Sequence, residues 1–190
     1  MLLLCTANQC RSPMAEVLLR HHLDRAGVLG SVASAGLYEG GAPATPHGIE
    51  VMAARGLDLA DHRSRCVDQA MLRSADLVLG MARQHVREAT VLAPEVLDRT
   101  FTLKELARAA TDAGPRPADE SLRAWLARIA AGRDRPALLG AGHDDALDVA
   151  DPIGGSRADY ERTAALLDDL LGQIVALSFP SPSRSQAAPA

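Results

Sequence analysis

The chain has 190 residues, 47% of them hydrophobic, a length that fits one packed domain better than two. Its formal net charge is -4 and no Lys/Arg-rich run occurs, which argues against nucleic acid or an anionic membrane as a partner. No apolar run approaches the ~20 residues of a membrane-spanning helix and no basic region precedes the opening "MLLL", so we expect a cytoplasmic protein.

Short apolar segments alternate with amphipathic ones along the chain. In chain order the pattern predicts strands at residues 1–4, 32–35, 75–81 and 99–103, and helices at 13–25, 46–55, 67–73, 83–94 and 159–177. Short apolar strands separated by helices are typical of an α/β fold. We therefore expect a four-stranded parallel, doubly wound sheet with helices on both faces.

Two segments fall outside this alternation. Residues 107–146 are too many for a structureless loop, and "ADESLRAWLARIAAG" has apolar residues at helical spacing, with Asp119 placed to cap a helix and Gly132 to end it. Residues 178–190 are rich in Ser, Pro and Ala and are expected to be a disordered tail. The predicted organisation is a single domain over residues 1–177.

The stretch "CTANQCRS" joins the first strand to the first helix. Such a loop is where open α/β sheets bind ligands, and the unpaired N–H groups of a helix start favour an anion. Ser12 is placed to be the N-cap and Pro13 the first helical residue, while the five residues between Cys5 and Arg11 are enough to wrap N–H groups around an oxyanion. These dipoles and the planar guanidinium of Arg11 favour the thiolate form of Cys5, which predicts a cysteine nucleophile at a phosphate site.

Each of these residue types also occurs for simpler structural reasons. A lone cysteine at a strand end is often a small buried hydrophobe, and the spacing of Cys5 and Cys10, with no third Cys or His nearby, is poor for zinc. With Cys66, the three cysteines are an odd count that argues against a disulfide framework. Asp151, in "DPIGGS", is either a turn former or the proton donor that a thiolate nucleophile needs for its leaving group.

These stretches resemble the low-molecular-weight protein tyrosine phosphatases. "CTANQCRSPMAE" is similar to their phosphate-binding loop and "DPIGGS" to their aspartate loop, with further matches in "SAG" (34–36), "DHRSR" (61–65) and "SADLVLGM" (74–81). The resemblance covers residues 1–106 and 147–177. It implies that residues 107–146 are a helical insertion before the aspartate loop.

The resemblance also implies a mechanism and a set of roles. Cys5 attacks phosphorus to give a phosphocysteine, Arg11 holds the phosphoryl oxygens, and Asp151 acts first as acid and then as base, with no metal or other cofactor. Cys10 is similar to the family's resolving thiol, which forms a reversible disulfide under oxidation. The implied substrates are phosphorylated proteins. The phosphate-binding loop comprises Thr6, Ala7, Asn8, Gln9, Cys10, Arg11 and Ser12, and its supporting hydrogen-bond network comprises Asn8, Ser12, Ser34 and His62.

Three departures from the family's pattern bear on the substrate. Ala7 stands where the family usually has Gly, Ile153 where tyrosine-directed members have an aromatic ring, and Gln9 where they have Ile and the related protein arginine phosphatases have Thr. Tyr38 is a candidate for the missing ring, so Gln9, Tyr38 and Ile153 are the expected substrate-slot residues. The alternatives to a tyrosine phosphatase are an arginine phosphatase, an arsenate reductase, which needs more downstream cysteines than Cys66, and a non-catalytic phosphate-binding module.

Overall fold

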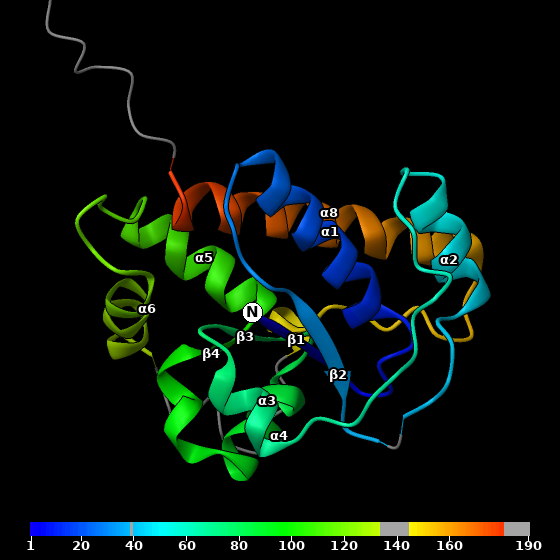
Figure 1. Ribbon diagram of the computed structural model, residues 1–190, viewed down its shortest axis with the longest axis horizontal. Coiled ribbons are helices and arrows are strands. Elements are labelled where there is room, and N and C mark those ends of the chain that lie inside the picture. The colour runs from blue at the N-terminus through cyan, green and yellow to red at the C-terminus, as the bar shows by residue number, and fades with distance from the viewer. Residues whose placement is uncertain (39, 134–144, 181–190) are drawn as a thin grey trace, which may run out of the picture.

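The computed structural model describes residues 1–38, 40–133 and 145–180, and its four strands form one parallel sheet (Figure 1). The strands are β1 (Leu2–Cys5), β2 (Ala33–Gly36), β3 (Val78–Gly80) and β4 (Thr100–Thr102), in the order β2-β1-β3-β4. Each pair is in parallel register, with Leu3 opposite Ser34 on one side and Leu79 on the other. The predicted sheet and its four strands are confirmed.

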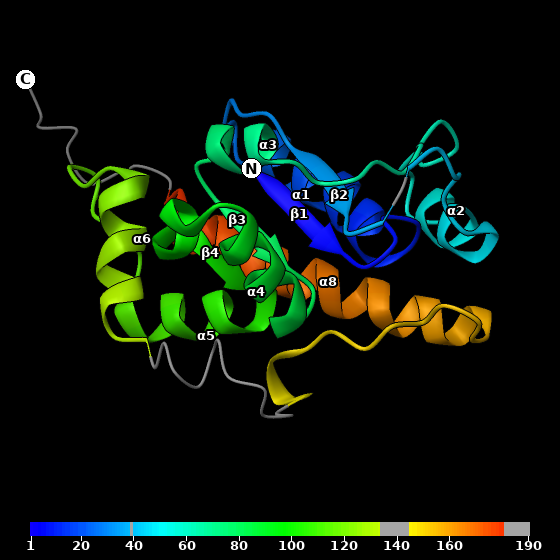
Figure 2. The same cartoon turned by 90° about the horizontal axis from the view of Figure 1, so that it is seen from below.

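Helices cover both faces of this sheet. They are α1 (Arg11–Arg25), α2 (Pro46–Ala53), α3 (Gln69–Ser74), α4 (Arg83–Leu92), α5 (Leu103–Ala113), α6 (Leu122–Ala131) and α8 (Arg157–Ser178), with short 3-10 helices η1 (Pro94–Arg99) and η2 (Asp145–Leu147). In Figure 1, α1, α5 and α8 lie on one side of the sheet and α3 and α4 on the other, and Figure 2 shows α2 and α6 at opposite ends of the molecule.

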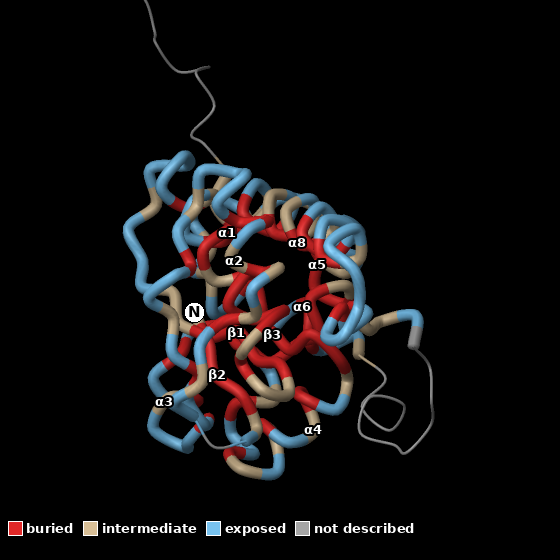
Figure 3. The backbone as a smooth tube through the Cα atoms, turned by 90° about the vertical axis from the view of Figure 1, so that its right-hand side faces the viewer, coloured by how far each residue is buried: buried red, intermediate tan, exposed pale blue. Residues whose placement is uncertain are grey.

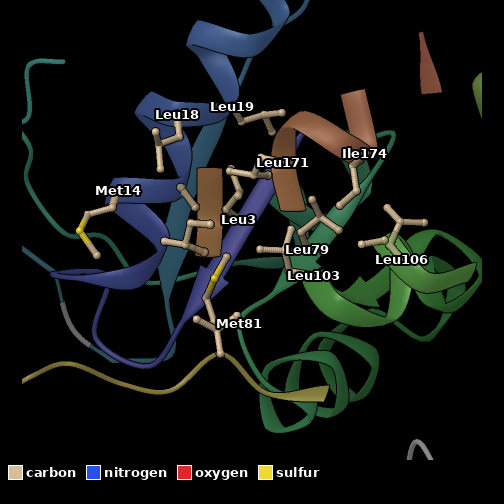
Figure 4. Close-up of a cluster of buried hydrophobic side chains, with 14 of the residues drawn as sticks. Leu3, Met14, Leu18, Leu19, Leu79, Met81, Leu103, Leu106, Leu171 and Ile174 are labelled. Atoms are coloured by element: carbon tan, nitrogen blue, oxygen red, sulfur yellow. The ribbon is translucent and has the colours of Figure 1, made fainter. Parts of the chain in front are cut away.

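Alternation along the strands builds a core on each face. Leu3 and Leu79 pack with α1, α5 and α8, where Figure 4 shows Leu18, Leu106 and Leu171 converging on them. Leu2, Leu4 and Val78 point the other way, towards α3, α4 and η1. In Figure 3 the strands and the inner sides of the helices are the buried parts of the backbone. Successive side chains of a strand point to opposite faces of the sheet. Because helices cover both faces here, both sets of side chains are apolar and the strands appear in the sequence as continuous apolar runs.

The region after β4 contains a helix that the sequence analysis did not predict. Leu103 was expected to end the strand, yet it begins α5, because Thr102 and Glu105 form a capping box at that point. Thr102 Oγ1 accepts a hydrogen bond from the Glu105 N–H at 3.1 Å, and Glu105 Oε2 accepts one from the Thr102 N–H at 3.1 Å. Ala107 and Ala110 of α5 are buried in the core, although both lie within residues 107–146, the segment expected to be an insertion.

The helix expected within residues 119–132 is present as α6 and ends at Gly132 as predicted. Its N-cap is Ser121 and not Asp119, because Ser121 Oγ accepts a hydrogen bond from the Ala124 N–H at 3.2 Å. Trp125 is fully buried beneath it. The expected insertion continues through residues 134–144, which lie outside the described residues.

The carboxyl-terminal helix runs one residue beyond its predicted end. Ser178, the last residue of α8, is buried, and Phe179 packs against the core. Arg116 donates from its backbone N–H to the Leu177 carbonyl at 2.8 Å and from Nε to the Ser178 carbonyl at 2.6 Å. Ser178 and Phe179 therefore pack with the domain, and residues 181–190 of the predicted tail lie outside the described residues.

Candidate active site

The loop between β1 and α1 brings the Cys5 sulfur against the first turn of a helix. Cys5 is the last residue of β1, and α1 begins at Arg11. Ser12 was expected to be the N-cap and Pro13 the first helical residue, but the N-cap is Cys10, with no side-chain capping hydrogen bond. The Ser12 hydroxyl instead donates to Cys5 Sγ at 3.0 Å. Beginning the helix at Arg11 thus places a hydroxyl donor, together with unpaired first-turn N–H groups, beside the thiol.

Asn8 holds the shape of this loop. It is the one non-glycine residue with positive φ (52°) among those described, a conformation that Asn tolerates better than most residues. Its Nδ2 donates to Ser12 Oγ at 3.0 Å and to Ser34 Oγ at 2.8 Å, and the His62 Nε2 lies 2.7 Å from its carbonyl oxygen. The four residues expected in the supporting network are therefore in contact. Ala7 needs no positive φ, so its replacement of Gly carries no backbone strain.

Two further side chains, to which the sequence pattern assigns no role, complete the network. Ser34 Oγ donates to Glu16 Oε2 at 2.6 Å, and Arg65 Nε donates to the Ser34 carbonyl at 2.7 Å. The Arg65 backbone N–H also donates to Asn8 Oδ1 at 3.0 Å. Both residues lie within stretches that carry the resemblance, "SPMAE" and "DHRSR", which was the available signal.

The end of β2 comes very close to the loop. A Cβ on Gly36 would lie 2.9 Å from the backbone atoms of Thr6, Ala7 and Asn8, and the Leu37 N–H donates to the Thr6 carbonyl at 2.8 Å. A larger residue at position 36 would push the loop away from the sheet. Gly36 therefore sets the distance between the loop and its neighbouring strand.

Arg11 and Asp151, 140 residues apart in sequence, form an ion pair. The Arg11 side chain is 7% exposed; its Nη2 donates to Asp151 Oδ2 and its Nη1 to the Val149 carbonyl at 3.0 Å. Asp151 Oδ1 accepts the Ile153 N–H at 3.2 Å, which fixes the carboxyl at the start of the Asp-Pro turn. The Arg11 Nε is buried without a hydrogen-bond partner in the described residues. A buried guanidinium with an unused donor and a displaceable carboxylate partner is suited to bind an oxyanion.

The turn between β3 and α4 supports both the loop and Asp151. The Met81 N–H donates to the Leu4 carbonyl at 2.8 Å, while the Met81 carbonyl accepts the Val149 N–H at 2.7 Å. Asp148 Oδ1 accepts the Arg83 N–H at 2.9 Å. The segment before Asp151 is thereby fixed to the sheet edge where the loop begins.

Cys10 differs chemically from Cys5 although both are buried free thiols. Burial, followed by the negative charge of Asp151, raises the pKa of Cys10 to about 12, against which a hydrogen bond with Tyr160 acts to lower it. Cys10 is thus a protonated thiol at neutral pH. The third cysteine, Cys66, is exposed.

The three expected substrate-slot residues differ in exposure. Gln9 is half-buried, and its carbonyl accepts the Thr45 N–H at 2.8 Å. Tyr38 and Ile153 are 61% and 52% exposed. Ile153 and Asp151 line a surface hollow that continues along α8 past Thr163 and Leu166.

Two further properties concern the described part of the chain as a whole. Within residues 1–38, 40–133 and 145–180, no group of three or more His, Cys, Asp or Glu side chains is arranged to hold a metal ion. No helix of the same residues is long and apolar enough to cross a membrane.

Comparison with known proteins assigns a family to this loop and fold. Residues 1–117 match the family model described as low molecular weight phosphotyrosine protein phosphatase. This match runs through α5 and ends before Asp151, in agreement with α5 being part of the common domain. The chain belongs to this family of cysteine-dependent phosphatases.

Individual relatives fall on both sides of the substrate question. The chain is 32% identical over 171 residues to the protein-arginine-phosphatase of Bacillus subtilis, covering 90% of each chain. It is 39% identical over 100 residues to the low molecular weight protein-tyrosine-phosphatase Etp of Escherichia coli, covering 53% of this chain and 66% of the relative. A cysteine-to-serine mutant of the YwlE arginine phosphatase, with a phosphorylated active-site serine, superposes with a TM-score of 0.68 at 30% identity over 91% of each chain.

Proposed function

We propose that the protein hydrolyses phosphorylated side chains of proteins, phosphotyrosine foremost, through a phosphocysteine formed on Cys5. The observation that carries this proposal is the meeting of three groups at one sheet edge. The Cys5 sulfur accepts the Ser12 hydroxyl, and the adjacent helix start presents Arg11, which is paired with Asp151. Nucleophile, oxyanion binder and proton donor are the three groups that phosphoryl transfer through a cysteine requires.

The reaction proceeds in two displacements. The Cys5 thiolate attacks phosphorus while the bond to the leaving oxygen breaks, and Asp151 gives its proton to that oxygen. Water then attacks the phosphocysteine, Asp151 takes a proton from this water, and the phosphorus–sulfur bond breaks to release phosphate and the thiolate. Ser12 stabilises the thiolate in both steps because its hydroxyl already donates to Cys5 Sγ.

The pairing of Arg11 with Asp151 gives phosphate binding a second consequence. A phosphoryl group offers two oxygens to the guanidinium and competes with Asp151 Oδ2 for Nη2. The carboxyl displaced in this way is released beside the leaving group. Substrate binding and the delivery of the acid are therefore linked through one side chain.

The test is a comparison of two cysteine variants on p-nitrophenyl phosphate. Cys5→Ser should reduce turnover by at least ~10³-fold while inorganic phosphate still binds, because removing the nucleophile leaves the oxyanion contacts intact. Cys66→Ser is the matched control and should keep wild-type turnover, since Cys66 is exposed. Acid quenching of the wild-type reaction should trap phosphate on the peptide that contains Cys5. Turnover by Cys5→Ser within tenfold of wild type would exclude the mechanism.

Protein arginine phosphatase activity is the second candidate, and one observation favours it. A relative that is similar over 90% of this chain is a protein-arginine-phosphatase, whereas the match to Etp covers 53% of this chain. Against it, Gln9 stands where the resemblance to arginine phosphatases implies Thr. Side-by-side kcat/KM values for phosphotyrosine and phosphoarginine peptides decide between the two. The cytoplasmic location, the lack of nucleic-acid or membrane partners and the redox role of Cys10 stay predictions.

A further inference from the structure

His85 connects the turn after β3 to the phosphate-binding loop. It lies in the first turn of α4 and is 1% exposed. A Cβ on Gly80 would lie 3.0 Å from the Cβ of His85 and 3.1 Å from the Ala82 carbonyl oxygen, so the glycine at position 80 leaves room for the start of the His85 side chain. His85 is thus a buried titratable side chain in the turn between β3 and α4, and Met81 and Arg83 of this turn bond to the segment before Asp151.

The two ring nitrogens of His85 have different partners. Nδ1 lies 2.9 Å from the Ala82 backbone nitrogen, and Nε2 lies 3.1 Å from Thr6 Oγ1. A backbone N–H can only donate, so Nδ1 is the acceptor and the ring proton is on Nε2. Burial and the nearby positive charge of Arg11 lower the pKa of His85 to about 3, so the ring is neutral at neutral pH. Nε2–H therefore donates to the Thr6 hydroxyl oxygen.

Thr6 Oγ1 is also an acceptor for Arg11, whose Nη2 lies 3.4 Å away. A hydroxyl oxygen has two lone pairs, and in this arrangement both face N–H donors, one from His85 and one from Arg11. The same Arg11 nitrogen touches Asp151. The orientation of the Thr6 hydroxyl thus bears directly on the guanidinium that the proposed mechanism uses.

We propose that His85 is a positioning residue for phosphoryl transfer, which holds the Thr6 hydroxyl as an acceptor for Arg11 and thereby aligns the guanidinium. The inference rests on the proposed function. The competing hypothesis is that His85 merely caps α4 through Ala82. The two hypotheses separate cleanly because each ring nitrogen serves only one of them.

Two amide substitutions divide the roles of the ring. In His85→Asn the amide oxygen takes the place of Nδ1 and keeps the cap on Ala82, but the side chain is too short to reach Thr6. In His85→Gln the amide nitrogen takes the place of Nε2 and keeps the donor to Thr6, but the acceptor for Ala82 is lost. A cap affects stability, and a hydrogen bond in the site affects phosphate binding and turnover.

We expect opposite effects of the two variants on stability and activity. His85→Asn should keep a Tm near that of wild type and lose about 3–10-fold in kcat/KM for p-nitrophenyl phosphate, with a similar loss in affinity for inorganic phosphate measured by calorimetry. His85→Gln should lower the Tm and lose less in kcat/KM than His85→Asn, because it keeps a donor to Thr6. Activity that follows Tm in both variants, or an unimpaired His85→Asn, would overturn the proposal.

Thr6 variants supply an independent arm should either histidine variant fail to fold. Thr6→Val removes the hydroxyl at constant shape and should match His85→Asn, whereas Thr6→Ser, which keeps the hydroxyl, should lose less kcat/KM than Thr6→Val. The double variant Thr6→Val/His85→Asn should be no worse than Thr6→Val alone, and losses that multiply would overturn the inference. Wild-type protein without turnover would contradict the proposed function instead, while the phosphate affinities would still report on His85 and Thr6.

Discussion

Lowering the pH should destabilise this protein through His85. The pKa of this buried imidazole is about 3 in the folded protein, against its ordinary value of 6.5 in the unfolded chain. Below pH 6.5 the His85 imidazole binds a proton in the unfolded chain but stays neutral in the folded protein. The stability contributed by neutral His85 is therefore complete above pH 6.5 and is lost progressively as the pH falls towards 3.

The size of the effect follows from the separation of the two pKa values. Each pH unit within that window costs about 1.4 kcal/mol, so His85 should remove about 2.5 kcal/mol from the free energy of unfolding between about pH 7 and about pH 4.5. This is a large share of the ~5–15 kcal/mol that stabilises an ordinary domain. Acid sensitivity well above pH 4 is the expected consequence.

Urea unfolding of wild type and His85→Asn at both pH values measures this effect. His85→Asn keeps the acceptor for Ala82 but cannot take up the proton, so its stability should fall by about 2.5 kcal/mol less than that of wild type over the same interval. His21→Asn, which removes an exposed imidazole, is the matched control. Equal losses in wild type and His85→Asn would refute the assignment of a neutral, buried ring.

Three further outcomes are expected. Asp151→Asn should slow hydrolysis of an alkyl phosphate by ~10²-fold or more and of p-nitrophenyl phosphate by less, since only the poor leaving group needs a proton; equal losses would exclude Asp151 as the acid. Mild peroxide should inactivate the enzyme reversibly, as it oxidises Cys5 to a sulfenic acid that condenses with Cys10 to a disulfide and water. Because the pKa of Cys10 is about 12, the rate of disulfide formation should increase about tenfold from about pH 7 to about pH 8. Mass spectrometry that finds only over-oxidised Cys5 would contradict this pairing. Ile153→Tyr should raise kcat/KM for phosphotyrosine peptides about 2–10-fold, because it supplies an aromatic face, and should leave kcat/KM for p-nitrophenyl phosphate nearly unchanged. If wild type prefers phosphoarginine over phosphotyrosine peptides by more than tenfold, the protein is an arginine phosphatase instead.

Features that depend on neighbours in sequence could be predicted from the sequence alone. The four parallel strands follow from short apolar runs, and α6 follows from helical spacing and Gly132. The loop from Cys5 to Arg11 was predicted as an anion site because a strand end and a helix start are themselves local patterns. Some boundaries were wrong where two local patterns compete. Leu103 was predicted to end a strand because it follows Phe101 in an apolar run, but the Thr102–Glu105 capping box makes it the first residue of α5.

The partners within the site were decided by the tertiary structure. The sequence pointed to Asp151 as an acid, but only the fold shows that its carboxyl pairs with Arg11 from the far end of the chain. The same holds for Glu16 and Arg65 around Ser34, and for His85 against Thr6, 79 residues away. Hydrogen bonds between distant residues leave no periodicity in the sequence, because their geometry is set by how the strands align at one edge of the sheet. Short sequence patterns therefore identify the types of residue needed for phosphoryl transfer, while the tertiary structure of the whole domain determines how these residues are oriented.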